Sequence, residues 1–315
     1  MAIRGLSIAT LFWLAVAGLG AAAQELATLK QEEVFALQQR LRDAGCYTAA
    51  INGIVGPELA AAVKACPSQD PILRIETGMH TANIWRIAVD GQCSLAATGS
   101  DDKTVRLWSL AAGQLLRTQR LPIGDGHLGK VFAVAVSPDG KRVAAGGYDA
   151  IQKSVTSYGV YLFDSATATQ ARHVGSFGNV LIHLAFSPDG KRLAVSLGGA
   201  QGVRVLDVET GVELMADRDY EDNSYGVAFG PDGALYAVGY DGFVRRYGPD
   251  LKRTAKVETP GGKQPHSVAV HPQGGKIAIG YDDKPAVDIL DAETLQRLVA
   301  ADVNGVNNGN LFSVA

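Results

Sequence analysis

The sequence has little cysteine, few aromatic residues, no strong charge of either sign and only one long apolar run. Its 315 residues carry a formal charge of −3, and the basic residues come in scattered pairs, so nucleic acid is not an expected partner. The three cysteines include no Cys-x-x-Cys pair and no histidine at ligand spacing, which argues against a metal site. Motifs of serine hydrolases, zinc proteases and phosphate-binding loops are missing as well. We expect no cofactor and no catalysis.

The one apolar run lies at the amino terminus and predicts a secretory signal over residues 1–23. Arg4 gives a positive start, Ile8–Leu19 is apolar, and Ala21–Ala23 supplies small residues before a cut expected after Ala23. At about a dozen residues, the run is shorter than the ~20 needed to span a bilayer, so a cleaved signal is favoured over an uncleaved anchor. We therefore expect a periplasmic or secreted protein that does not span the membrane.

Residues 24–67 predict a small helical module, and residues 68–71 a linker. Turn-forming residues separate two helical stretches, and Pro57 suits the first turn of the second. The first stretch places three apolar residues on one face: Val34, Leu37 and Leu41.

This module resembles the small three-helix peptidoglycan-binding domain. Four segments carry the match: Leu37-Gln38-Gln39-Arg40-Leu41, Gly45-Cys46-Tyr47, Asn52-Gly53-Ile54-Val55-Gly56-Pro57 and Ala61-Ala62-Val63. Asn52 replaces the usual Asp, and Cys66 stands where an aromatic-Gln pair normally closes the second helix. The resemblance implies binding to peptidoglycan, and the departures leave a purely structural helical cap as the alternative.

Cys46 and Cys66 are the candidate disulfide, because both lie in a segment too small to build much core. Closing a loop of about twenty residues would stabilise the module by roughly 3 kcal/mol in the chain-entropy model. Cys93 would then remain as a small buried residue. The sequence alone does not settle the pairing.

From residue 72 onward the sequence is repetitive and predicts a mainly β fold. One alternating register returns six times, and its alanines lie 47, 50, 43, 41 and 46 residues apart: Ala88, Ala135, Ala185, Ala228, Ala269 and Ala315. Tight turns such as Ser137-Pro138-Asp139-Gly140 separate alternating strands. This period is typical of four-stranded β-propeller blades.

The first unit closely resembles a WD40 repeat, through Gly78-Met79-His80, Ala97-Thr98-Gly99-Ser100-Asp101-Asp102 and Lys103-Thr104-Val105-Arg106-Leu107-Trp108. The resemblance implies a hydrogen-bonded structural tetrad of His80, Thr98, Asp102 and Trp108. Holding the blade together is favoured over catalysis by His80, since nothing beside His80 in the sequence looks like a nucleophile. Later units keep the strands but lose the Trp and most of the tetrad.

Five complete blades and the start of a sixth span residues 72–315, an incomplete propeller. WD40 propellers usually close by lending an amino-terminal strand to the last blade, and Leu73–Thr77 looks like that strand. We expect truncation from a seven-bladed parent, which would need roughly 80–90 further residues at ~40–45 per blade. An open arc, or closure by a partner's strands, is the alternative.

Function is expected on one face of the propeller. The candidate partner-binding rim consists of Tyr148, Tyr240 and Tyr281, which follow the second strands, together with Trp85. Aromatic side chains of this kind are enriched at binding hot spots, although packing at a strand end is the alternative for each tyrosine. We therefore expect an exported interaction scaffold that binds protein partners.

The alternative function is a propeller hydrolase or lactonase with a site facing the channel. Such a site needs acidic, Asn or His residues that point inward from several blades. The aligned inner positions supply no carboxylate: Arg86, Ala133, His183, Gly226 and Ser267. The scaffold is therefore the favoured reading, with His183 as a packed polar residue.

Overall fold

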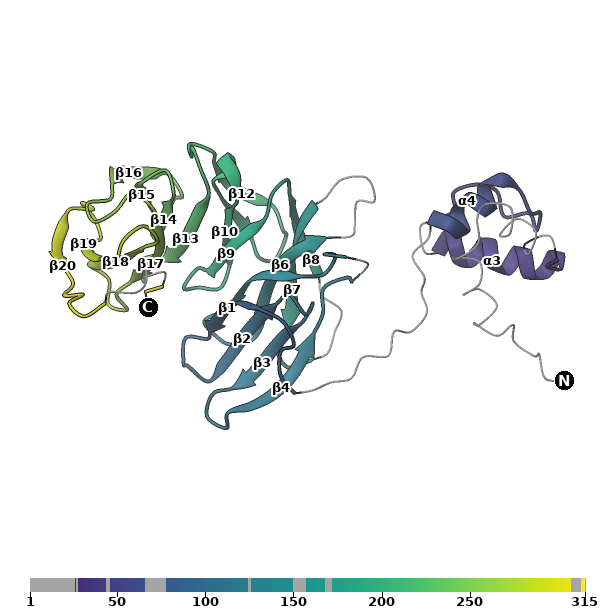
Figure 1. Ribbon diagram of the computed structural model, residues 1–315, viewed down its shortest axis with the longest axis horizontal. Helices are drawn as coiled ribbons and strands as arrows, with labels where there is room; N and C mark the ends of the chain where they lie inside the picture. Colours follow the sequence, from purple (N-terminus) through teal and green to yellow (C-terminus); the bar gives the residue numbers. More distant parts are fainter. Residues whose placement is uncertain are drawn as a thin grey trace. The chain divides into compact units, whose positions relative to one another are not determined.

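The computed structural model describes Leu26 and residues 28–43, 46–65, 78–123, 126–149, 157–167, 172–306 and 313–314. The chain divides into two compact units, Met1–Ile75 and Glu76–Ala315 (Figure 1). The predicted signal (1–23), the linker (68–71) and the lent strand (73–77) lie outside the described residues. None of the described helices combines the length and the apolar character that crossing a membrane requires.

The described residues of the first unit include two helices, α3 (Gln31–Asp43) and α4 (Pro57–Ala65). Pro57 begins α4, as expected of a residue whose missing N–H costs nothing in the first helical turn. The apolar face of α3 packs against the apolar side of α4 in one cluster that includes Leu26, Val34, Leu37, Leu41, Tyr47, Leu59 and Ala62. Burial of these side chains, rather than helix propensity alone, holds two helices this short.

The second unit contains five four-stranded antiparallel sheets, each a propeller blade whose strands follow one another in sequence order. Blade one consists of β1 (Ile84–Val89), β2 (Leu95–Ser100), β3 (Val105–Ser109) and β4 (Gln114–Gln119). Blade two consists of β5 (Val131–Val136), β6 (Arg142–Asp149), β7 (Ser157–Asp164) and β8 (Arg172–Phe177). Blade three consists of β9 (Leu181–Phe186), β10 (Arg192–Leu197), β11 (Val203–Asp207) and β12 (Glu213–Asp217). Blade four consists of β13 (Ser224–Phe229), β14 (Leu235–Gly239), β15 (Phe243–Tyr247) and β16 (Arg253–Glu258). Blade five consists of β17 (Pro265–Val270), β18 (Lys276–Tyr281), β19 (Val287–Asp291) and β20 (Arg297–Ala300). A short 3₁₀ turn, η2 (Gly199–Gln201), joins β10 to β11.

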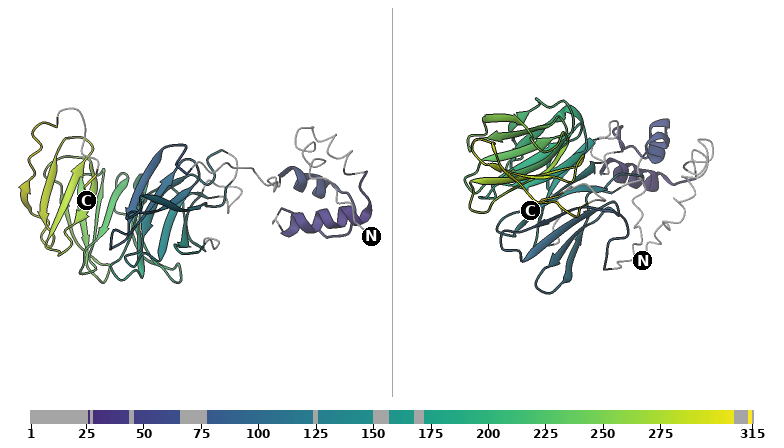
Figure 2. Two further views of the ribbon diagram at one scale, coloured as in Figure 1. Left: turned by 90° about the horizontal axis from the view of Figure 1, so that it is seen from below. Right: turned by 60° about the vertical axis from the view of Figure 1, so that its left-hand side comes forward.

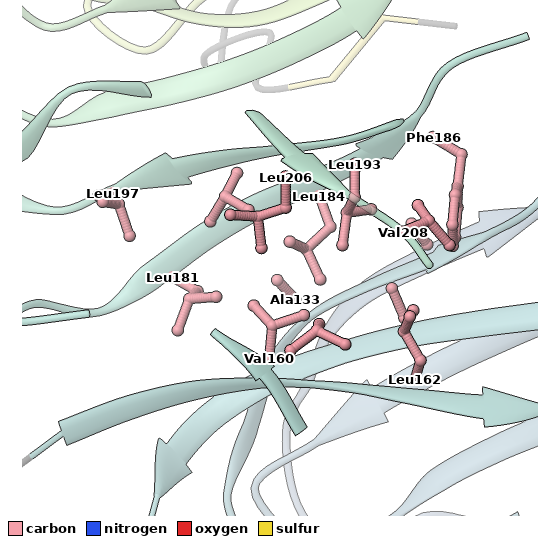
Figure 3. Packing of buried hydrophobic residues seen from close by; sticks show 14 residues of the cluster. Ala133, Val160, Leu162, Leu181, Leu184, Phe186, Leu193, Leu197, Leu206 and Val208 are labelled. Atoms are coloured by element: carbon pink, nitrogen blue, oxygen red, sulfur yellow. The ribbon is translucent and has the colours of Figure 1, made fainter. Parts of the chain in front are cut away.

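The innermost strands β1, β5, β9, β13 and β17 lie next to one another in that order (Figures 1 and 2). Between neighbouring blades the apolar side chains form dry clusters. Figure 3 shows Leu181, Leu184 and Phe186 of blade three packing against Val160 and Leu162 of blade two. The expectation of a mainly β, WD40-like propeller with five complete blades is confirmed for the described residues.

Every innermost strand carries a β-bulge at its second residue. The pairing register between the first and second strands of each blade skips that residue: Trp85, Phe132, Ile182, Tyr225 and His266. A bulge inserts one unpaired residue and re-aims its side chain. The fold therefore presents one specially placed side chain per blade at the same end of the innermost strand.

The face of β1 that points away from blade two is open in the described residues. Ile87 occupies the register position of Val134, Leu184, Val227 and Val268. In blades two to five the preceding blade buries this position, as shown by Leu184 at 2 % exposure, whereas Ile87 is 66 % exposed. Apolar side chains at equivalent positions therefore differ in their contribution to stability: the position is buried between blades in blades two to five and exposed in blade one.

This difference predicts unequal effects of matched truncations. Leu184→Ala should lower the free energy of unfolding by about 2–5 kcal/mol, because it leaves a cavity between blades two and three. Ile87→Ala, at the equivalent position, should change it by less than about 0.5 kcal/mol. Urea unfolding of the two variants and the parent chain measures both values, and a loss at Ile87 as large as that at Leu184 would contradict the exposure described above.

Candidate functional site

The four residues of the expected tetrad are hydrogen-bonded to one another in blade one. His80 Nδ1 lies 2.9 Å from Asp102 Oδ2, and His80 Nε2 lies 2.7 Å from Thr98 Oγ1. The indole Nε1–H of Trp108 donates to the same Thr98 oxygen at 2.8 Å. The four residues come from the loop before β1, from β2, from the β2–β3 turn and from β3, so the network ties all of these segments together.

A neutral imidazole with its proton on Nδ1 satisfies the whole network. Asp102 can only accept, so His80 Nδ1–H donates to it, and His80 Nε2 is left as an acceptor for the Thr98 hydroxyl. Thr98 in turn accepts from Trp108. Each of the four side chains therefore has a hydrogen-bond partner within the network.

The Asp102 carboxylate is held in its ionised form. Burial opposes ionisation, but hydrogen bonds from the Thr104 hydroxyl, the Thr81 backbone N–H and His80 outweigh it and hold the pKa of Asp102 below its usual value. The carboxylate thus anchors the loop before β1 to the β2–β3 turn.

Blade four uses different side chains at the same register positions. Tyr220 stands where blade one has His80, Asp241 where it has Asp102, and Tyr247 where it has Trp108. The hydroxyls of Tyr220 and Tyr247 lie 3.2 Å apart, and a fully buried Arg245 pairs with Asp241 and covers the Tyr220 ring at 3.6 Å.

Since a Tyr–Arg–Asp network can replace a His–Thr–Asp–Trp network at these positions, their shared task is to join a loop to a strand. This favours the structural reading of His80 over the catalytic one.

The inner positions of the strands are packed rather than open. The imidazole Nδ1 of His183 accepts a hydrogen bond from the Val227 backbone N–H at 3.2 Å. Burial, together with the nearby Arg86 and His266, lowers the pKa of His183 to about 3, so the ring is neutral at physiological pH. A Cβ on Gly226 would lie 3.0 Å from the Ser267 backbone, which shows how closely the inner strands approach.

Among the described residues no cluster of three or more His, Cys, Asp or Glu side chains is arranged to hold a metal ion.

The rim is formed by pairs of side chains, one pair from each blade. Each pair joins the bulged residue of the innermost strand to the residue that follows the paired end of the second strand: Trp85 with Asp101, Phe132 with Tyr148, Ile182 with Gly198, Tyr225 with Tyr240, and His266 with Asp282. Direct contacts support the assignment. The indole Nε1–H of Trp85 donates to Asp101 at 3.0 Å, and Tyr225 stacks on Tyr240 with ring centroids 4.0 Å apart.

The first aromatic group of the rim lies on blades one and two. Trp85 is 52 % exposed and meets Phe132 edge-on at 6.1 Å, and Phe132 meets Tyr148 at 5.5 Å. His127 stacks on Tyr148 at 5.4 Å, and Tyr158 lies 4.8 Å from it. Burial and the hydrogen bond with Tyr148 raise the pKa of Tyr158 to about 12, so the Tyr158 hydroxyl is neutral at physiological pH.

The second aromatic group lies on blades four and five. Tyr225 stacks on Tyr240 and lies 4.6 Å from His266, and the Tyr240 hydroxyl donates to the Asp282 carboxylate. Burial and this carboxylate raise the pKa of Tyr240. Blade three, with Ile182 and Gly198 at the corresponding positions, separates the two groups and contributes no aromatic ring at these positions.

Tyr281 does not belong to the rim, and its assignment as a contact residue is wrong. Its side chain is 0 % exposed, and its hydroxyl donates to Asp288 Oδ2 at 2.6 Å. The Gly-Tyr-Asp triplets of blades four and five look alike in sequence but are offset by one residue: Tyr281 pairs with Pro265, as Gly239 pairs with Ser224. A shift of one residue turns a side chain to the opposite face of the sheet.

Phe132, Tyr225 and His266 are rim residues that the sequence analysis did not assign. Only Trp85 was singled out among the bulged positions. The signal was present in the repeats, because the second residue of the strand is aromatic in four of the five units and is followed by a strictly alternating pattern. Recognising it requires knowing that a bulge re-aims this residue.

In the helical module the buried Gln38 side chain organises the loop that follows Tyr47. Its Nε2–H₂ group donates to the Ile54 carbonyl at 3.0 Å and to Asn52 Oδ1 at 3.1 Å, while its Oε1 accepts from the backbone N–H groups of Asn52 and Gly53. Asn52 Oδ1 also accepts from the Ile54 N–H. The amide of Asn52 thus takes over the turn-forming task of the more usual Asp.

The cysteines divide into two cases. Cys46 is half-buried against the helical core, and Cys66 lies outside the described residues, so their pairing stays a prediction. Cys93 is free and exposed in a turn with φ of 52°, so its assignment as a small buried residue is wrong.

The five described blades have the architecture of a WD40-like propeller, and the amino-terminal part of the propeller carries WD40 repeats. The family model described as "WD domain, G-beta repeat" matches residues 74–109 and 114–151.

Three relatives fit this class. The chain is 28 % identical over 163 residues to WD repeat-containing protein SL1-17 of Schistosoma mansoni, which covers 51 % of this chain and 49 % of that protein. It is 30 % identical over 157 residues to small ribosomal subunit protein RACK1y of Oryza sativa subsp. japonica (47 % and 42 %). It is 39 % identical over 66 residues to eukaryotic translation initiation factor 3 subunit I of Debaryomyces hansenii (21 % and 17 %). The chain thus spans about half the length of these relatives or less.

The tetrad predicts a stability loss that depends on pH. Asp102→Asn places an amide N–H₂ against groups that donate to the carboxylate, so the free energy of unfolding at pH 7 should fall by about 1–3 kcal/mol. Because the folded pKa of Asp102 is depressed, the native carboxylate contributes most above pH ~5 and loses its contribution as the pH falls below ~4. The difference in the free energy of unfolding between the parent and Asp102→Asn should therefore decrease over that acidic range.

Urea unfolding of both proteins between pH 7 and 3 measures this gap. Asp139→Asn is the matched control, since Asp139 caps an exposed turn where water can replace its hydrogen bonds, and its effect should be smaller. A constant gap across the pH range, or equal losses at Asp102 and Asp139, would contradict the anchoring role of Asp102.

Proposed function

We propose that this protein is an exported, non-enzymatic interaction scaffold whose propeller binds a protein partner through the rim. The single observation that carries the proposal is the placement of aromatic side chains at the bulged positions of four innermost strands. Bulges are concentrated where a side chain must be re-aimed for function, and exposed aromatic rings supply rigid contact area at hot spots. Two of the relatives are, by their names, subunits of larger assemblies, which is consistent with a scaffold.

A hydrolase with a channel-facing site is the less favoured function. The inner register positions offer a single neutral imidazole, that of His183, and no carboxylate. A lone neutral imidazole in a packed position supplies neither a nucleophile nor a set of metal ligands.

The rim predicts where a partner can be captured by cross-linking. A photo-reactive phenylalanine analogue placed at Trp85 should form an adduct with the partner in the exporting cell, because this exposed ring lies in the first aromatic group. The same analogue at Leu116, which is 54 % exposed on the outer strand β4, is the matched control. Trp85→Ala should weaken binding of the captured partner by about 30-fold, the size of a typical hot-spot loss.

Equal adducts from both positions, or an unchanged affinity in Trp85→Ala, would show that binding does not use the rim. The scaffold would then need another surface.

A second function, tethering to peptidoglycan, is proposed for the helical module. Gln38 fixes the loop at residues 52–54 against α3, and Gly53 is in close contact with Gln31. Phe35 lies between Gln31 and Gln38 along α3, and both Phe35 and Ile54 are exposed. An organised loop flanked by two exposed apolar side chains is the feature that a glycan chain could use.

This tether predicts co-sedimentation. The exported protein, beginning at Gln24, should pellet with purified peptidoglycan, and the Phe35→Ser/Ile54→Ser double variant should pellet at least about fivefold less, a loss of roughly 1 kcal/mol. Val212→Ser, which removes an exposed apolar side chain from the propeller unit, is the matched control. Equal pelleting of all three proteins would assign the module a structural role, and an amino terminus other than Gln24 would refute the predicted cleavage site.

A further inference from the structure

Arg86 crosses from blade one to blade three. It occupies the third position of β1, directly after the bulged Trp85, and its Nε–H donates to the Ile182 carbonyl of β9 at 3.1 Å. Blade two permits this reach because its residue at the same register position is Ala133. The guanidinium therefore lies over the innermost strands, between the two aromatic groups of the rim.

No carboxylate among the described residues lies within ion-pair distance of Arg86. Two other arginines of the propeller that are buried are treated differently: Arg245 pairs with Asp241, and Arg204 lies 3.4 Å from Glu213. Burial lowers the pKa of Arg86, and the neighbouring Tyr225 offsets this only in part. The half-buried Arg86 guanidinium donates to a backbone carbonyl but pairs with no carboxylate among the described residues, so the desolvation of its charge is poorly compensated. A bound anion would offset this desolvation cost.

The groups around Arg86 also suit an anion. His183 follows Ile182, whose carbonyl accepts from Arg86, and since the Nδ1 of His183 accepts from Val227, the proton of the neutral ring sits on Nε2. Tyr225 interacts electrostatically with Arg86, and the rim carboxylate of blade five, Asp282, is already engaged by Tyr240. The guanidinium fork offers the two parallel N–H groups that a carboxylate takes up.

We propose that Arg86, with His183 and Tyr225 beside it, is a carboxylate-binding site, and that the partner is an acidic peptide segment lying across the rim. The inference deepens the proposed function, because it names the chemistry of the partner at the same face. The two aromatic groups would hold the flanking side chains of the segment, and Arg86 its acidic residue. The carboxylate comes either from a Glu or Asp side chain or from the carboxyl terminus of the segment.

The site is tested on the full chain with small blocked amino acids and the NMR signal of the indole N–H of Trp85, the residue that precedes Arg86 in β1. N-acetyl-glutamate α-amide carries a side-chain carboxylate, N-acetyl-glutamine a terminal carboxylate, and N-acetyl-glutamine α-amide no charge. We expect saturable shifts with at least one of the first two, with Kd values of about 1–10 mM for ligands this small, and none with the neutral amide. The probe that binds identifies the source of the carboxylate.

Arg86→Gln should weaken binding of the charged probe at least tenfold, whereas Arg86→Lys, which keeps the charge but loses the fork, should fall between it and the parent. Arg117→Gln on the outer strand β4 is the matched control and should bind as the parent does. Equal binding of charged and neutral probes, no binding of any probe, or an unchanged affinity in Arg86→Gln would overturn the proposal. If Arg86→Gln does not fold, the comparison of the charged probes with the neutral probe on the parent chain still tests the proposal.

Failure of this test is distinguishable from failure of the proposed function. If the probes do not bind but the adduct at Trp85 forms, the rim binds a partner without the carboxylate site. If the probes bind but no adduct forms at Trp85, the carboxylate site exists and the proposal that a protein partner binds through the rim is refuted.

Discussion

The rest of the propeller depends on one constraint, the bulge at the second residue of every innermost strand. Side chains alternate between two faces along a strand, so an extra residue at one point decides which of them enter the core on either side of it. After the bulge, Val134 and Leu184 face the preceding blade, and Ile87 occupies the equivalent position on the open face of β1. At the bulge, Trp85 and Phe132 belong to the rim. Core and candidate binding surface are therefore set by the same backbone irregularity.

Polar networks built from different side chains occupy equivalent positions in different blades and make the same connection between a loop and a strand. Blade one joins its entry loop to its third strand through a histidine, a threonine and a tryptophan. Blade four does so with two tyrosines around an arginine–aspartate pair. Most buried polar groups in proteins are hydrogen-bonded, and different sets of side chains supply these bonds in blades one and four. Divergence of the tetrad across the repeats is thus compatible with a single architecture.

The sequence predicted the fold well because its signals were local and repeated. The recurring alternation at Ala88, Ala135 and Ala185 and the Pro-Asp-Gly turns need only strand periodicity and glycine's tolerance of positive φ, which Gly140 shows at 70°. The tetrad followed from a resemblance in which each residue had a match. The rim was only partly predictable: Tyr148 and Tyr240 come directly after the last residue of the second strand that pairs with the first, whereas Tyr281 is itself that last paired residue and is buried.

Long-range arrangements were the part that the sequence could not supply. The reach of Arg86 to Ile182 spans 96 residues and depends on small side chains in blade two. Likewise, the exposure of Cys93 follows from a turn conformation at positive φ that no residue pattern announced. Such features arise from the packing of one repeat on another, and the sequence of a single repeat gives little information about that packing.

The open face of β1 has a consequence for thermodynamics. Ile87 and its neighbours Trp85 and Val89 form an apolar surface of the kind that blade packing buries elsewhere in this chain. Any molecule that covers this surface binds the folded chain and not the unfolded one, so it shifts the folding equilibrium by mass action. The apparent melting temperature of the protein then depends on the concentration of the covering molecule.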